Sequence, residues 1–355
     1  MKKEIGSIFP LSDAALSKAE SEKKSFNGDR VYYSLCREAL YDIAKAMSGT
    51  EKTVLIPAYT CQTVITPFEE AGWHCEFYSI TKDLRINTQK LIEANEKYHP
   101  SVVVVHPYFG MDLCDEEVKA FNSLNHKGVK IVLDLTQCIF TNKEYPFASI
   151  IVASYRKWMP IPDGGYLINK TDSLQFEQPE QENNEFTENE KAAMYLRGQY
   201  FENGEQRTKD ISIRLSKAAD IIAESNITPH KMSQVAYNLL KKEDVENNKN
   251  RRYANYTYLF NSITESKKVT KVCFNIANVT TAPLYFTIYV QNRQELQRLL
   301  AKDAIYAPVI WPIEDERVLI DEDVKYIYDH ILAIPCDHRY DENDMQRAVE
   351  IINNY

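Results

Sequence analysis

The chain alternates short, continuously apolar runs with segments in which apolar residues recur every three or four positions. Five runs are predicted to be strands: Thr53–Pro57, Cys75–Ile80, Ser101–Val105, Val129–Asp134 and Ser149–Ala153. Helical spacing predicts helices through Val64, Phe68 and Ala71, over Thr88–Tyr98 and around Glu116–Asn122. Strands that are apolar along their whole length are typical of a parallel sheet with helices on both faces. We therefore expect an α/β fold with a mostly parallel sheet.

The segments around these runs complete the expected organisation. A short strand from Val31 is expected to lead into a helix that ends near Ser48 and Gly49. Residues 171–228 are rich in charge and are expected to form a solvated helical excursion or lid. Apolar spacing then predicts one long helix from Lys231 to about Leu259.

Beyond the long helix the pattern changes to short alternating strands and helices. These elements are expected at Lys271–Ile276, Ala282–Val290, Arg293–Leu300 and Asp341–Asn353. Such a mixture is typical of a small α+β domain. We therefore expect a large domain over residues 1–250 and a smaller C-terminal domain over residues 251–355, with the hinge inside the long helix near residue 250.

Composition and charge disfavour several classes of protein. The net charge of −9 over 355 residues argues against a nucleic-acid-binding surface or a polybasic membrane patch. The N-terminal residues lack the apolar core of a signal peptide, and no apolar run is long enough to span a bilayer. The seven cysteines are odd in number and scattered, without a Cys-x-x-Cys pair, which favours reduced thiols in a cytoplasm. We expect no metal site.

Polar and ionisable residues follow the ends of four predicted strands. Ligands of parallel sheets bind beyond the carboxyl ends of the strands, so these side chains are expected to converge there. They are Tyr59 and Thr60, His106 and Tyr108, Asp134 and Gln137, and Ser154 and Lys157. Two ordinary alternatives stay open: Asp134 also fits the N-cap of a following helix, and His106 also fits a core histidine.

Lys157 stands in a stretch that is unusual for this chain. Pro160 and Pro162 stiffen the loop after it, because proline fixes its own φ and restricts its neighbour. The pair Gly164–Gly165 uses two of only ten glycines, where the backbone must approach another group closely or adopt a positive φ. The alternative is a surface lysine in an ordinary turn, since a second apolar run follows at Tyr166–Ile168.

A strand-end lysine, a buried strand-end aspartate and a helix start together meet the needs of pyridoxal phosphate. A lysine amine forms an imine with the aldehyde of this cofactor. A carboxylate beside the ring nitrogen keeps that nitrogen protonated, which makes the ring an electron sink. The phosphate binds backbone N–H groups at a helix N-terminus. Lys157, Asp134 and the helix start at Cys36 and Arg37 are the candidates for these roles.

The order of these motifs resembles the DegT/StrS-type family of pyridoxal-phosphate sugar aminotransferases, which have the three-layer aspartate-aminotransferase fold (fold type I). The similarity runs from about Tyr33 to Arg252. Its motifs are Pro57-Ala58-Tyr59-Thr60, His106 to Asp112, Asp134-Leu135-Thr136-Gln137, and Ser154-Tyr155-Arg156-Lys157 followed by Gly164-Gly165. The resemblance implies that Lys157 is the Schiff-base lysine, that Asp134 pairs with the pyridine nitrogen and that Gln137 approaches the ring hydroxyl.

Several positions depart from the family pattern. Cys36 stands where the phosphate loop of the family usually has glycine. Ser154 replaces a histidine and is expected to offer its hydroxyl to the phosphate. The aromatic residue that often stacks on the cofactor falls near Cys61, so Tyr59 or Tyr108 is expected to stack instead.

The segment Thr228–Ser233 resembles the turn through which one subunit of the family reaches the phosphate of its partner. Pro229 and Lys231 replace the asparagine and the arginine of that turn. We expect His230 and Lys231 to make substrate or partner contacts, Lys231 through its charge. The resemblance thus implies a homodimer.

The resemblance implies an aminotransferase that moves an amino group from glutamate to a keto sugar, nucleotide-linked, in amino-sugar or polysaccharide biosynthesis. Arg37 and Thr60 complete the expected cofactor contacts, although Arg37 equally fits a structural salt bridge. Two other functions stay open. One is a dehydratase or lyase of the same fold, which the presence of Lys157 disfavours. The other is a cofactor-free relative that acts as a binding or regulatory protein, which the departures from the family pattern keep open.

Overall fold

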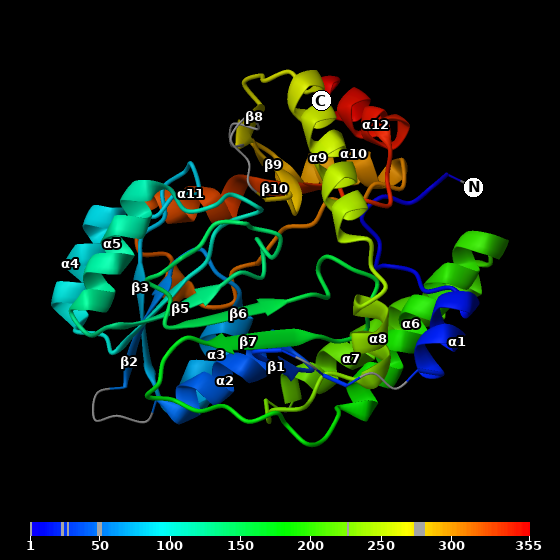
Figure 1. Cartoon of the computed structure of the whole chain (residues 1–355). Helices are drawn as coiled ribbons and strands as arrows, with labels where there is room; N and C mark the ends of the chain where they lie inside the picture. The colour runs from blue at the N-terminus through cyan, green and yellow to red at the C-terminus, as the bar shows by residue number, and fades with distance from the viewer. Residues whose placement is uncertain (1, 23–24, 27, 48–51, 226, 273–280) are drawn as a thin grey trace.

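The computed structural model describes residues 2–22, 25–26, 28–47, 52–225, 227–272 and 281–355 (Figure 1). Seven strands form one sheet in the order β1-β7-β6-β5-β4-β2-β3. Their bounds are β1 Arg30–Tyr33, β2 Thr53–Pro57, β3 His74–Tyr78, β4 Val102–Val105, β5 Lys130–Asp134, β6 Ile150–Ser154 and β7 Gly165–Asn169. The five strands β6, β5, β4, β2 and β3 are parallel to one another, whereas β7 is antiparallel to both of its neighbours, β1 and β6. The mostly parallel sheet predicted from the sequence is confirmed.

Helices cover both faces of this sheet, which explains the continuously apolar strands. Every residue of β4 and of β6 is buried. α2 (Cys36–Ala46) and α3 (Gln62–Glu70) pack together on one face, and α4 (Thr88–Tyr98) and α5 (Asp115–His126) pack together on the other (Figure 1). Connections between parallel strands are right-handed. The connections through α2 and α3 lead toward the β3 edge of the sheet, and those through α4 and α5 lead back toward β5. The two pairs of helices must therefore lie on opposite faces. The sheet is therefore the middle of three layers.

The charged segment forms two long helices. α6 (Asn184–Asn203) and α7 (Gln206–Ser225) pack against each other and are joined at Gly204, whose φ is +73°. The helical structure expected here is present, but several side chains are buried, among them Phe186 and Arg197. A lid role for the segment stays a prediction. Near this pair, α1 (Asp13–Glu20) packs on α8 (Gln234–Leu240).

The C-terminal part of the chain builds a second, antiparallel sheet in the order β10-β9-β8. The elements of this part are α9 Val245–Ser262, β8 Val269–Val272, β9 Tyr285–Val290, α10 Arg293–Lys302, a 3₁₀ helix η2 Glu316–Val318, α11 Glu322–His330, β10 Ile331–Pro335 and α12 Glu342–Asn353. Buried residues of α9, β9, β10 and α12 form an apolar cluster of their own, which Ile5 joins. The expected domain boundary near residue 250 falls inside α9 and stays a prediction.

The long helix expected from Lys231 to Leu259 is wrong, because two separate helices occupy this segment. The Ser233 hydroxyl accepts a hydrogen bond from the Ala236 amide (3.2 Å) and caps α8. The Asp244 carboxylate accepts one from the Asn247 amide (3.1 Å) and caps α9. Each cap satisfies an amide that has no partner within its helix, so each starts a new helix.

Two sequence predictions fall partly outside the described residues. These are the helix end near Ser48 and Gly49, and residues 273–276 of the strand predicted from Lys271. The strand predicted from Ala282 begins only at Tyr285.

Candidate active site

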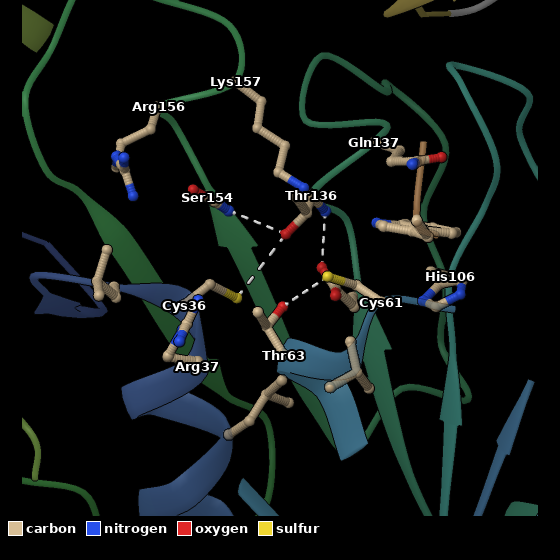
Figure 2. Close-up of a pocket in the computed structure, with 15 residues that line it drawn as sticks. Cys36, Arg37, Cys61, Thr63, His106, Thr136, Gln137, Ser154, Arg156 and Lys157 are labelled. Atoms are coloured by element: carbon tan, nitrogen blue, oxygen red, sulfur yellow. Dashed lines mark hydrogen bonds between the residues drawn. The ribbon is translucent and has the colours of Figure 1, made fainter. Parts of the chain in front are cut away.

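The ends of β5 and β6 and the start of α2 surround one cavity of about 210 Å³ (Figure 2). β5 and β6 are parallel neighbours, so both carboxyl ends lie at the same edge of the sheet. Seven residues predicted from the sequence line this cavity: Cys36, Arg37, His106, Asp134, Gln137, Ser154 and Lys157. The convergence expected at the strand ends is present for these seven.

Lys157 is exposed on a tight turn directly after β6. The Trp158 amide donates to the Tyr155 carbonyl (2.9 Å) and closes the turn. The buried Trp158 indole donates to the Thr136 carbonyl (2.7 Å). Arg252 of α9 lies 4.8 Å from the centre of the Trp158 ring and donates to the Trp158 carbonyl (3.3 Å). The lysine side chain therefore extends toward the end of β5 from a firmly held backbone (Figure 2).

Gly164 and Gly165 allow the lysine segment to pass close to α2. Gly164 has a φ of +135°, a conformation that residues with a side chain rarely adopt. A Cβ atom on Gly165 would lie 2.7 Å from the Cys36 amide nitrogen. The sequence predicted a positive φ or a close approach for this pair, and the structure shows one of each.

Asp134 is almost fully buried, with 5% of its surface exposed. One carboxylate oxygen accepts a hydrogen bond from the Thr136 amide (2.8 Å). Within the described part of the chain the carboxylate has no ion-pair partner. No helix follows Asp134 directly, so the N-cap alternative is wrong. A buried carboxylate without a counter-ion favours a ligand that brings a cationic group.

Gln137 and His106 form one wall of the cavity. The Gln137 amide oxygen accepts from the Phe109 amide (2.9 Å), and Figure 2 shows the side-chain nitrogen on the cavity side. His106 is buried, and its Nε2 lies 3.3 Å from the Tyr59 carbonyl oxygen. Burial lowers the pKa of His106, although the Asp134 charge opposes this shift. At neutral pH the ring is therefore uncharged and offers a flat face to a ligand.

The end of the cavity beside α2 is positively charged. The helix begins at Cys36, so its first backbone N–H groups lie there and carry the positive end of the helix dipole. Arg37 and Arg156 line the same end, beside the Ser154 backbone (Figure 2). Burial, aided by the Asp134 charge, raises the pKa of the Cys36 thiol well above its usual value, so the sulfur is neutral. This end suits an anion.

Tyr59, Tyr108 and Thr60 do not line the cavity. The Tyr108 hydroxyl donates to the Tyr59 carbonyl (2.7 Å), and the Tyr59 hydroxyl donates to the Ile310 carbonyl (3.1 Å). The Thr60 amide donates to the Tyr328 hydroxyl (3.1 Å). All three are buried; the hydroxyls of Tyr59 and Tyr108 are hydrogen-bonded, whereas the Thr60 hydroxyl has no partner within the described residues. The expectation that a tyrosine stacks on a ligand does not fit this arrangement.

His230 and Lys231 also lie away from the cavity. His230 Nδ1 is 3.1 Å from a carboxylate oxygen of Glu38, and this hydrogen bond raises the pKa of His230. The backbone of Lys231 pairs with Tyr33, and its ammonium lies 5.4 Å from the centre of the Phe26 ring. A contact from either residue to a partner subunit stays a prediction.

Sequence reasoning missed several residues that line the cavity, among them Thr136, Arg156 and Trp311. The Thr136 hydroxyl accepts from the Ser154 amide (3.1 Å) and ties the ends of β5 and β6 together. Trp311 lies 5.4 Å from the His106 ring and has a φ of +59°, which a bulky residue rarely adopts. Thr136 lies inside the quoted Asp134–Gln137 motif, which placed it near the site. No local pattern marks Trp311.

A second cavity of about 380 Å³ adjoins the first on the side of the C-terminal sheet. Five residues line both cavities: Cys61, Gln137, Arg156, Lys157 and Trp311. The second cavity reaches Arg252 of α9 and Tyr285 of β9. Lys157 therefore lies between two chambers, one above the large sheet and one toward the C-terminal elements.

The residues of the first cavity fit pyridoxal phosphate. Lys157 supplies the amine, Asp134 supplies a buried carboxylate that lacks a counter-ion, and the α2 end supplies positive charge. Among the described residues, no three His, Cys, Asp or Glu side chains are placed to hold a metal ion. No helix within the same residues is long and apolar enough to cross a membrane.

Neither protein-family models nor curated protein sequences match the chain. Solved structures match it over nearly its whole length. The PMP form of a putative sugar aminotransferase from Streptococcus pneumoniae has a TM-score of 0.71 at 13% identity and covers 99% of this chain and 97% of its own. PseC of Helicobacter pylori, an aminotransferase involved in the biosynthesis of pseudoaminic acid, has a TM-score of 0.67 at 13% identity and covers 99% of each chain.

A DegT/DnrJ/EryC1/StrS aminotransferase from Brucella abortus has a TM-score of 0.67 at 15% identity, and the match covers 96% of this chain and 94% of that one. At such low identity the likeness concerns the fold. It confirms the fold expected from the motifs, including both the large sheet and the C-terminal elements. The chain therefore has fold type I, the fold of these pyridoxal-phosphate aminotransferases.

Proposed function

We propose that this protein is a pyridoxal-phosphate-dependent aminotransferase and that Lys157 bonds to the cofactor. One observation carries the proposal: Lys157, Asp134 and Gln137 line a single cavity at the strand ends of an aminotransferase fold. When bound, the cofactor supplies an aldehyde that takes up an amino group and a ring that stabilises negative charge.

Each residue of the site has a separate role in this proposal. The Lys157 amine would bond to the aldehyde carbon and, when free, would move the proton between the α-carbon of the substrate and that cofactor carbon. The buried Asp134 carboxylate would hold a protonated ring nitrogen, because it has no ion-pair partner within the described residues. The Gln137 side-chain nitrogen would donate to the ring hydroxyl. The tight Trp158 turn keeps the lysine within reach of both cavities.

The substrates belong to the same proposal. We propose glutamate as the amino donor and a keto sugar, nucleotide-linked, as the acceptor, in amino-sugar or polysaccharide synthesis. Similar structures support a sugar as the acceptor, since those proteins are named sugar aminotransferases. The second cavity is the chamber for the substrate, because it opens beside Lys157 on the side away from the sheet. A cytoplasmic homodimer completes the proposal.

Cofactor uptake and amino transfer test the proposal directly. The purified protein should absorb visible light after incubation with pyridoxal phosphate, and borohydride should abolish this absorbance. Lys157→Ala should lack it, whereas Lys170→Ala, which removes an exposed lysine after β7, should retain it. Glutamate should shift the absorbance and appear as 2-oxoglutarate, and Lys157→Ala should reduce this release by several orders of magnitude.

Other outcomes point to the other functions. A protein that takes up no cofactor is not an aminotransferase and acts as a binding or regulatory protein. A coloured protein that leaves glutamate unchanged uses another donor or catalyses elimination.

A further inference from the structure

Two arginines meet at the α2 end of the first cavity. Arg37 is the second residue of α2, and Arg156 directly precedes Lys157. Both line the cavity, and Figure 2 shows both guanidinium groups on the side of Cys36 and Ser154. They are close enough for the charge of Arg156 to act against that of Arg37, although burial is the larger effect on the pKa of Arg37. Two like charges beside one cavity favour an anion between them.

Both guanidinium groups keep donors free for such an anion. Arg37 donates to the Ala223 carbonyl (3.0 Å), and Arg156 donates to a Glu190 carboxylate oxygen (3.4 Å). A guanidinium group has five N–H donors, and neither arginine makes a further direct hydrogen bond within the described residues. Their acidic neighbours, Glu190, Asp220 and Glu224, belong to α6 and α7 and do not line the cavity.

We infer that Arg37 and Arg156 bind the phosphate of the cofactor as a pair, within one chain. This inference rests on the proposed function and adds the source of the positive charge. The α2 amides contribute to the same anion site, but they do not define it. The turn at Lys231 lies elsewhere in this chain, with its ammonium over the Phe26 ring. Lys231 of this chain therefore takes no part in the arginine pair.

Pyridoxal phosphate and pyridoxal, which differ only in the phosphate, provide the test. Their affinities for the cofactor-free protein are measured from the visible absorbance. The wild-type protein should prefer pyridoxal phosphate. Arg37→Met and Arg156→Met should each weaken pyridoxal phosphate binding about tenfold or more, as expected for losing a hydrogen-bonded charge. Pyridoxal binding should change little, because the ring and the Lys157 amine are retained.

Two further variants separate the arginine pair from general charge and from a partner contact. Arg214→Met removes an exposed arginine of α7 and should leave both affinities unchanged. Lys231→Met should also keep the preference for pyridoxal phosphate. On the wild-type protein, inorganic phosphate should compete with pyridoxal phosphate but not with pyridoxal. This measurement needs no variant, so it remains valid if a substituted protein fails to fold.

The outcomes distinguish this inference from the proposed function. Uptake of neither compound by the wild-type protein overturns both. Uptake with no preference for the phosphorylated compound, or a preference that survives both arginine substitutions, overturns the arginine pair and leaves the aminotransferase proposal intact. Loss of the preference in Lys231→Met shows that the phosphate is instead held across a subunit boundary.

Discussion

Gly165 lies where the first residue of β7 meets the start of α2. Its missing side chain brings the Cys36 amide to within 2.7 Å of the position that a Cβ atom would occupy. The neighbouring atoms are backbone atoms of Leu35 and Cys36, which have no rotamer to change. The close approach of α2 to β7, and with it the positive end of the cavity, therefore requires that residue 165 has no side chain.

Gly165→Ala should destabilise the protein by about 1–3 kcal/mol, because overpacking forces α2 and β7 apart. It should also weaken pyridoxal phosphate binding more than pyridoxal binding, since α2 carries the anion site. Urea unfolding and the two absorbance titrations measure these effects. Gly128→Ala is a suitable control: it meets open space, so it should cost only the strain of a φ near +94°, about 1–2 kcal/mol. Unaltered phosphate selectivity in Gly165→Ala would contradict the proposed role of α2.

At the scale of elements, Asp163 joins the lysine loop to two helices. Its carboxylate accepts from the Thr187 hydroxyl of α6 (3.0 Å) and from the Ser233 amide (2.9 Å) and hydroxyl (2.8 Å) at the start of α8. Burial raises the pKa of Asp163 to about 7, and these hydrogen bonds only partly oppose it. The loop that carries Lys157 is therefore held by a carboxyl group that titrates near neutral pH.

This buried carboxyl group should make stability depend on pH. An unfolded aspartate releases its proton near pH 4, whereas the folded protein keeps the Asp163 proton up to about pH 7. Between these values the folded state binds more protons, so stability should fall as the pH rises, by at most about 1.4 kcal/mol per pH unit. Asp163→Asn should remove this slope in urea unfolding between pH 4.5 and 7, and Asp172→Asn, at an exposed position, should retain it. Equal slopes in both variants would show that Asp163 is ionised in the folded protein.

At the scale of the whole molecule, the N-terminal segment ties the C-terminal elements to the rest of the chain. Ile5 is fully buried, donates to the Ala304 carbonyl (3.0 Å) and accepts from the Tyr306 amide (2.8 Å). The adjacent Glu4 is buried against Arg197 of α6 (3.1 Å). The first residues thus connect α6 with the second apolar cluster.

Ile5→Ala should destabilise the protein by about 2–4 kcal/mol, because it leaves a cavity in the second cluster. Ile320→Ala, at a side chain that is 43% exposed, should change stability by no more than about 0.5 kcal/mol. Thermal and urea unfolding of both variants provide the comparison. A small effect of Ile5→Ala on the free energy of unfolding would show that the N-terminal segment does not stabilise the C-terminal elements.

Much of the site was predictable because its residues are encoded locally. Asp134 is the last residue of one apolar strand and Lys157 lies three residues after another, and the ends of parallel strands must meet at one edge of the sheet. The failures have a different origin. Tyr59 and Tyr108 also follow strands, but neither lines the cavity: Tyr59 packs on Tyr328 and donates to the Ile310 carbonyl, and Tyr108 donates to the Tyr59 carbonyl. Strand position does not tell which side chain a neighbouring segment will cover.

The α/β alternation, the strand-end residues and the Lys157 segment with its two glycines can all be read from the sequence. These features depend on periodicity, turn chemistry and motif order, which act over a few residues. Three further features come from long-range packing: Trp311 lines the site, Arg156 joins Arg37, and Lys157 lies between two cavities. These contacts join segments that are far apart in the chain. Which side chains share a cavity therefore depends on how those segments pack, and local sequence patterns do not specify that packing.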